Sequence, residues 1–145
     1  YYGCMLLRPR ELAIDDPEDP QILEELLRAL GVQVADSPLK TRCCGSYLTV
    51  NRKEIVSDLV YDILIRAVNE GADAVAVSCP LCAFNLDERQ TEVRKLHPTF
   101  EFVPVFYFTQ LMALAFGLDT AQCGFEAHSV DPRKLLEKKG LLERE

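Results

Sequence analysis

The stretch Thr41-Arg42-Cys43-Cys44-Gly45 organises this chain, and it has to be read together with Cys79-Pro80-Leu81-Cys82 downstream and Cys4 near the start. Five of the six cysteines lie in these three places. Adjacent cysteines are poor disulfide partners because their side chains diverge, whereas two thiolates on one tight turn can bind neighbouring irons of one cluster. The C-x2-C stretch adds a short loop that presents two sulfurs in one direction. The pattern predicts a metal site with five thiolates available.

Length and composition define the class of protein. At 145 residues, with 48% hydrophobic and 27% charged residues, the chain is the size of one globular domain that can bury a core without disulfides. A net charge of -7 and an isoelectric point near 4.9 argue against a nucleic-acid or anionic-membrane partner, because either requires a basic face. No apolar run approaches the ~18 residues of a membrane span. We expect a cytoplasmic protein with reduced thiols and no direct membrane insertion.

The chain opens on Tyr1-Tyr2-Gly3-Cys4, which reads like the end of a strand that runs into a functional loop. No methionine stands ahead of it. We therefore expect residues 1–145 to form a single domain that is a fragment of a longer protein with two such domains.

Apolar spacing and helix-ending residues predict alternating helices and strands. The first helix is expected to have Asp19 as N-cap and Pro20 as first residue, and to end at Gly31. The second opens at Asn51, where Glu54 three residues on completes a capping-box-like signal. The expected strands are 32–35, 74–77 and 102–106, and the further helices are 51–69, 82–96, 109–116 and 131–140. This order predicts an α/β fold, with a small, mainly parallel sheet and flanking helices.

The run Ala74-Val75-Ala76-Val77 is apolar on both faces, which is typical of a central strand in a parallel sheet covered by helices. It leads directly into Ser78-Cys79. In open α/β sheets, ligands bind beyond the carboxyl ends of the strands. We therefore expect a cysteine-lined metal site at one end of the sheet.

The full spacing is Cys4, 38 residues, Cys43-Cys44-Gly45, 34 residues counted from Cys44, and Cys79-x2-Cys82. This pattern resembles the CCG, or cysteine-rich, domain of the B-type subunit of heterodisulfide reductase and its relatives, although the second gap is one or two residues shorter than in the family pattern. Tyr2-Gly3-Cys4 followed by Leu6-Leu7-Arg8-Pro9, and Pro104-Val105 ahead of Gln110-Leu111, resemble the second, C-terminal CCG domain of that subunit.

The resemblance implies that five cysteines are the ligands of a non-cubane [4Fe-4S] cluster: Cys4, Cys43, Cys44, Cys79 and Cys82. It implies a redox domain of a multi-subunit oxidoreductase acting on a sulfur group, in which a disulfide is reduced or formed between two such clusters. The implied partners are a second CCG domain, an iron-sulfur subunit that donates electrons, and a disulfide or thiol substrate. The isolated domain is expected to be inactive because it cannot supply the second cluster.

Two other interpretations of the cysteines stay open. The first is a structural Zn²⁺ site, or an electron-relay module, within a larger redox complex; zinc takes four ligands, so it leaves the fifth cysteine without a role. The second is thiol-disulfide exchange through Cys79 and Cys82, which does not explain the Cys43-Cys44 pair.

The remaining candidates have ordinary interpretations. Cys123 stands outside the pattern and is expected to be a buried or half-exposed free thiol. His97, ahead of Pro98, is expected at a helix end, where a cation is favourable. For His128 we expect a hydrogen-bonding role, with a substrate or proton role as the alternative. Three cations flank the cysteine turns and are either exposed charges or stabilisers of an anionic cluster or substrate: Arg8, Lys40 and Arg42.

Overall fold

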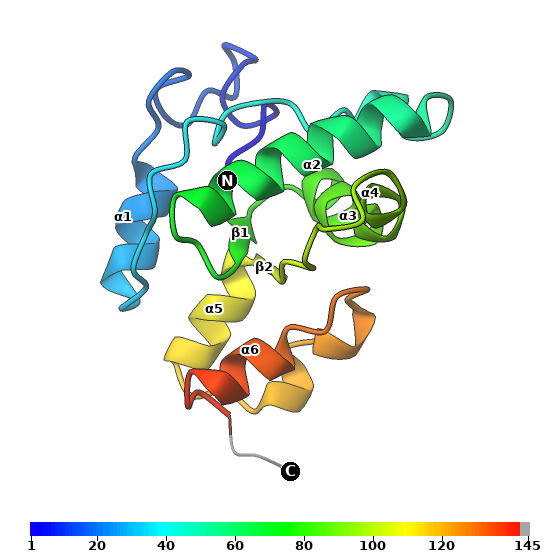
Figure 1. The fold of residues 1–145 in the computed structure, drawn as a ribbon. Helices are drawn as coiled ribbons and strands as arrows, with labels where there is room; N and C mark the ends of the chain where they lie inside the picture. Colours follow the sequence, from blue (N-terminus) through cyan, green and yellow to red (C-terminus); the bar gives the residue numbers. More distant parts are fainter. Residues whose placement is uncertain (143–145) are drawn as a thin grey trace.

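The structure, a computed structural model, describes residues 1–142. In chain order the helices and strands are α1 Ile22–Ala29, α2 Lys53–Asn69, β1 Val75–Val77, α3 Pro80–Glu88, α4 Gln90–Leu96, β2 Val105–Tyr107, α5 Phe108–Ala115 and α6 Arg133–Lys138. Short 3₁₀ turns lie at Ser46–Leu48, Thr120–Gln122 and Phe125–Ala127. Figure 1 shows the two strands at the centre, with α2 above them, α1 on the left, α3 and α4 on the right, and α5 with α6 below.

The sheet confirms the predicted α/β class. β1 and β2 are parallel, with Val75 opposite Val105 and Val77 opposite Tyr107. The segment between them contains α3 and α4, as the crossover between parallel strands requires. β2 begins at Val105 rather than at Phe102, because Pro104 has no N–H and contributes its carbonyl alone, to the N–H of Val75 at 2.9 Å.

Helix α2 supplies one wall of the main core. Its buried residues follow the helical period and meet β1, α3, α4 and β2 in one cluster. Each fully buried Val or Leu of this kind contributes about 1.5–3 kcal/mol. These residues on α2 are Val56, Val60, Ile63, Leu64 and Ala67.

The predicted start of α1 was wrong. The helix begins at Ile22, and the capping carboxylate belongs to Asp15, which accepts hydrogen bonds from the backbone N–H groups of Gln21 at 2.7 Å and Ile22 at 2.6 Å. The phenol of Tyr2 accepts a further one from Leu23 N–H at 2.7 Å. The cap comes from residues distant along the chain, so local sequence pointed to Asp19 instead.

Three other local predictions were wrong. Residues 32–35 form no strand, because they and β1 line one cavity that leaves no partner at the spacing of about 4.8 Å that a ladder needs. The side chain of Asn51 does not cap α2, whose N-cap is Arg52 without a side-chain cap. The helix expected at 82–96 is two helices that meet at Arg89. There the buried amide of Gln90 donates to the carbonyl of Leu86 at 2.7 Å, competing with the helix ladder.

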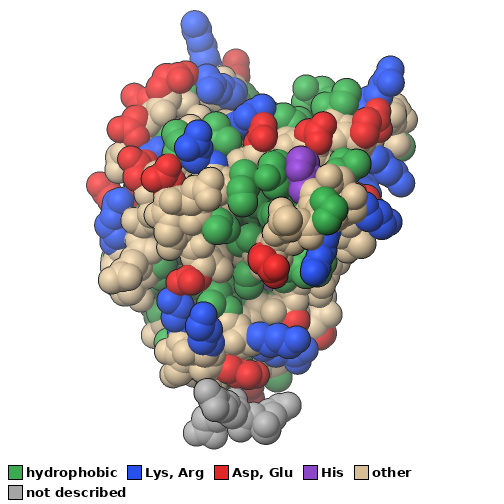
Figure 2. All heavy atoms as spheres, in the orientation of Figure 1, with side chains coloured by type: hydrophobic (Ala, Val, Ile, Leu, Met, Phe, Trp, Pro, Cys, Tyr) green, Lys and Arg blue, Asp and Glu red, His purple; other side chains and the backbone are tan. Residues whose placement is uncertain are grey.

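The surface agrees with the acidic composition. The face in Figure 2 carries Lys and Arg side chains interspersed with Asp and Glu, and it shows no single basic patch. Hydrophobic side chains gather in a hollow at the centre of this face (Figure 2).

Candidate metal centre

The first pair of cysteines lies at the carboxyl end of β1, as predicted. β1 ends at Val77, Cys79 is the N-cap of α3, and Pro80 is the first residue of that helix, with a trans peptide bond before it. Cys82 is in the first turn, so the helix begins two residues before the predicted start. The N-terminus of a helix favours negative charge, and a thiolate is stabilised there.

The second pair lies on the turn before α2. Gly45 adopts φ 76°, the left-handed region that an L side chain rarely enters, and the 3₁₀ turn Ser46–Leu48 follows. The backbone N–H of Gly45 donates to Cys43 Sγ at 3.4 Å. Cys44 is buried, whereas Cys43 is half-buried. The two adjacent thiols therefore face different surroundings from one turn.

The fold brings all five predicted cysteines into one place. The sulfurs of Cys44 and Cys82 are 3.5 Å apart. The side chains of Cys79 and Cys82 are within hydrogen-bonding range of each other, and so are those of Cys4 and Cys43. All of these thiols are free, as is Cys123. In the part of the chain that the structure describes, no three His, Cys, Asp or Glu side chains converge as the ligands of a single metal ion.

The electrostatics of the thiols differ within the group. The hydrogen bond with Cys82 is the main cause that lowers the pKa of Cys44 to about 6, against the opposing effect of burial; the N–H of Ser46 and the amide of Asn85 act in the same direction as Cys82. The same contact raises the pKa of Cys82, which therefore keeps the proton of the pair. Burial, followed by the neighbouring Cys43, raises the pKa of Cys4 to about 11.

Two features besides the thiols fit a bulky sulfur-ligated group. A Cβ on Gly3, which has φ +69°, would lie 2.8 Å from Cys82 Sγ, so the backbone approaches the site at a distance that a side chain would block. The hydroxyl of Ser78, next to Cys79, is buried and has no hydrogen-bond partner in the described structure. A hydroxyl in such a place is a donor available to an anionic acceptor.

The side chain of Tyr1 also belongs to the site, although the sequence analysis did not single it out as a site residue. Its hydroxyl donates to the carbonyl of Arg42, next to the cysteine pair. Burial raises the pKa of this phenol, and the charge of four nearby thiolates raises it further, those of Cys82, Cys44, Cys43 and Cys4. An aromatic residue three positions before the first cysteine was the available signal.

The flanking cations all make ion pairs. Arg8 lies 2.7 Å from Glu18, Lys40 lies 2.8 Å from the buried carboxylate of Glu24, and Arg42 lies 3.3 Å from Asp62 (nitrogen to oxygen). These contacts favour the interpretation as paired charges.

The two histidines and the sixth cysteine have structural contacts. His97 lies at the end of α4, as expected, and its ring stacks on Tyr61 with centroids 3.7 Å apart. A ring nitrogen of His128 lies 2.9 Å from the amide nitrogen of Gln110. Cys123 is a buried free thiol, which confirms its prediction, and it packs with Phe106 in a separate small core.

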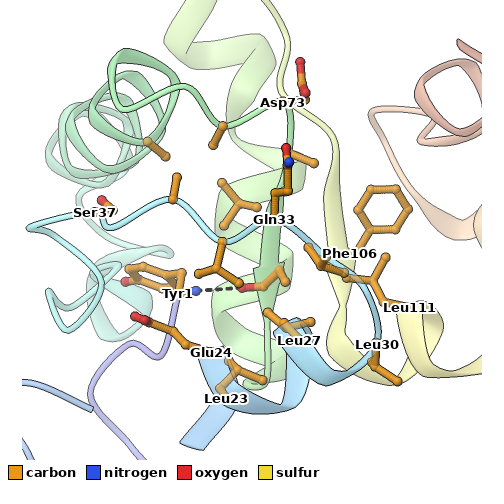
Figure 3. Close-up of a pocket in the computed structure, with 18 of the residues that line it drawn as sticks. Tyr1, Leu23, Glu24, Leu27, Leu30, Gln33, Ser37, Asp73, Phe106 and Leu111 are labelled. Carbon is orange, nitrogen blue, oxygen red and sulfur yellow. Dashed lines mark hydrogen bonds between the residues drawn. The ribbon is translucent and has the colours of Figure 1, made fainter. Parts of the chain in front are cut away.

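The largest cavity lies apart from the cysteines. It has a volume of about 660 Å³ and is lined by α1, the segment 31–35, β1 and α5, with no cysteine among its described lining residues. Figure 3 shows Leu23, Leu27 and Leu30 on one side, and the amino group of Tyr1, which donates to the carbonyl of Ala76 at 2.8 Å. Burial lowers the pKa of this amino group to about 6. The sequence analysis missed this cavity because its walls are distant along the chain.

Together, the small parallel sheet and the thiols at its carboxyl end define a cysteine-rich α/β domain. Residues 1–87 match the model of the cysteine-rich domain family, CCG, so the chain belongs to that family. The resemblance seen in the sequence is thereby confirmed.

Curated relatives agree with this assignment. The chain is 31% identical over 136 residues to the 8-methylmenaquinol:fumarate reductase membrane anchor subunit of Wolinella succinogenes, which covers 93% of this chain and 48% of that protein. It is 30% identical over 146 residues to the B-type subunit of the ferredoxin:CoB-CoM heterodisulfide reductase of Methanosarcina mazei, covering 95% of this chain and 47% of that subunit. A protein of Archaeoglobus profundus, named for its likeness to the B-type subunit of heterodisulfide reductase, is 34% identical over 125 residues, which are 81% of this chain and 41% of that protein.

The chain thus spans about half the length of the curated relatives it matches, or somewhat less. Within residues 1–142, no helix has both the length and the apolar character that crossing a membrane requires.

Proposed function

We propose that this chain is an iron-sulfur redox domain of a heterodisulfide-reductase-like oxidoreductase, and that Cys4, Cys43, Cys44, Cys79 and Cys82 hold a non-cubane [4Fe-4S] cluster. The observation that carries the proposal is the meeting of five free thiols from three distant segments at the carboxyl end of β1. Subunits named for heterodisulfide reduction among the relatives support the redox role.

The donor set favours iron-sulfur chemistry over one zinc ion. Zinc takes four ligands in a tetrahedron, whereas thiolates are the ligands of iron-sulfur clusters. The adjacent pair Cys43-Cys44 can serve neighbouring irons from one turn. When bound, such a cluster supplies electrons one at a time, and reduction of a disulfide to two thiols consumes two electrons and two protons.

The chain's own residues have separate tasks in this proposal. The five cysteines fix the cluster on the sheet edge. Gly3 keeps that edge open to it, since a Cβ there would contact Cys82 Sγ. The phenol of Tyr1 and the carbonyl of Arg42 close one side of the site.

The proposal extends to the whole protein. The chain would correspond to the second of two CCG domains, and the first would hold the other cluster across a disulfide or thiol substrate. An iron-sulfur subunit would donate the electrons, so the isolated domain would be inactive. A cytoplasmic location is part of the proposal, since six free cysteines are stable in a reducing compartment.

The test is iron, acid-labile sulfide and zinc analysis, with EPR, on chain prepared without oxygen. We expect about four irons per chain and an EPR signal that Cys44→Ser changes. Cys123→Ser is the matched control, because Cys123 is equally buried but lies in a different core cluster. One zinc per chain, unaffected by Cys44→Ser, would refute the redox proposal and indicate a structural module.

A further inference from the structure

Asn85 is a fully buried side chain in contact with one of the cysteines. It lies three residues after Cys82 on α3, which places both on the same side of the helix. Its amide nitrogen is 3.1 Å from the carbonyl oxygen of Cys44 and 3.7 Å from Cys44 Sγ. A primary amide has two N–H donors, so one can serve each acceptor. The longer distance suits sulfur, which is larger than oxygen.

The orientation of this amide follows from its other partners. The hydroxyl of Thr49 lies 2.9 Å from Asn85 Oδ1, and Arg89 donates to the same hydroxyl from Nε at 3.2 Å and from Nη2 at 3.1 Å. Arginine can only donate, so the hydroxyl oxygen accepts and its single proton is left for Asn85 Oδ1. The amide NH₂ must then face Cys44. A row of aligned dipoles therefore runs from the charged Arg89 to the sulfur.

We propose that Asn85, held by Thr49 and Arg89, is a positioning residue that donates a hydrogen bond to the Cys44 sulfur and stabilises the reduced state of the bound cluster. The inference rests on the proposed function. A donor directed at a ligand sulfur stabilises the negative charge that the cluster gains with one electron, so it raises the reduction potential. It also fixes the direction of the Cys44 side chain, which lies 3.5 Å from that of Cys82.

The test compares Asn85→Leu and Thr49→Val with Gln90→Leu. Gln90 is the matched control because it is also a fully buried amide, and its described hydrogen bonds go to the backbone of Leu86 and Val103. The measurements are the midpoint potential from an EPR-monitored redox titration and the rate at which bound metal is released to a chelator. Both need the anaerobically prepared chain.

Asn85→Leu should lower the equilibrium constant for one-electron reduction about tenfold, which is a shift of about 59 mV to more negative potential. Thr49→Val should shift it in the same direction by less, because the amide loses its orientation but not its N–H groups. Metal release should be about 10–100-fold faster in Asn85→Leu. Gln90→Leu should leave the potential unchanged, whatever it costs in stability.

Each result decides the inference. Potentials of Asn85→Leu and Thr49→Val equal to wild type would overturn it, and so would an equal shift in Gln90→Leu, which would indicate general loosening. If the wild-type chain holds zinc and no iron, the proposed function fails, and zinc release becomes the readout. Faster release from Asn85→Leu and Thr49→Val than from Gln90→Leu would then support the role of Asn85, and equal rates would overturn it. A wild-type chain that binds neither metal would overturn both.

Discussion

Gly3→Ala is the substitution that tests most directly whether the backbone is shaped around the cysteine site. An added Cβ would lie 2.8 Å from Cys82 Sγ, closer than real Cβ atoms approach other heavy atoms. Carbon contacts are optimal at about 3.5–4.0 Å, so the sulfur has to move by roughly 0.7–1.2 Å. Metal-ligand distances tolerate only about 0.2 Å. We therefore expect Gly3→Ala to lose most of its bound metal.

The backbone cost of the substitution can be measured separately with Gly31→Ala. Gly3 has φ +69° and Gly31 has φ +86°, but a Cβ on Gly31 meets no atom within 4 Å. The left-handed conformation costs an alanine about 1–2 kcal/mol, offset by about 0.4–1 kcal/mol from the less flexible unfolded chain. Gly31→Ala should therefore lose about 1 kcal/mol, or about 2–4 °C in Tm. Gly3→Ala should lose a further 1–3 kcal/mol, approximately, from overpacking.

The assays are thermal unfolding of the metal-free chain and metal content after anaerobic preparation. Normal metal content in Gly3→Ala, with a Tm loss equal to that of Gly31→Ala, would refute the reasoning, because the contact with Cys82 would then carry no cost. Metal loss in both variants would refute it too, since the backbone conformation alone would explain the effect.

Three further predictions concern the supports of the fold. Asp15→Ala should lose about 1 kcal/mol in urea unfolding at pH 7, because the carboxylate caps α1. Burial acts to raise the pKa of Asp15, but hydrogen bonds from backbone N–H groups outweigh it and lower that pKa, so the stabilisation is present above the unfolded pKa and is lost as the pH falls through the folded one; a difference between variant and wild type that persists at pH 2 would contradict this. Asp87→Ala should speed amide hydrogen exchange at Ser129 and Val130, whose N–H groups donate to this carboxylate at 2.7 and 3.0 Å, and unchanged exchange there would show that other contacts hold the tail. Leu64→Ala, at a fully buried position of α2, should cost about 2–5 kcal/mol by calorimetry, and a loss below 1 kcal/mol would indicate that the core collapses into the space.

Most of the architecture could be predicted because it depends on local patterns. The apolar period of α2, the apolar run of β1 and the glycines after α1 and α2 are each contained within a few residues. The errors fall where a distant residue decides. Asp15 caps α1 across an intervening loop, and the buried amide of Gln90, bonded to Val103, accompanies the break between α3 and α4.

For the site, the sequence alone determined which residues are candidates: the adjacent pair Cys43-Cys44, the C-x2-C at the end of a strand, and the family to which this spacing belongs. Only the tertiary structure decided what surrounds them. The contact between Cys44 and Cys82 joins positions 38 residues apart. The orientation of Asn85, the close approach of Gly3 and the buried phenol of Tyr1 likewise depend on packing between segments that are distant along the chain. Thiol chemistry follows from residue type, whereas the shape and electrostatics of a site follow from which segments the core brings together.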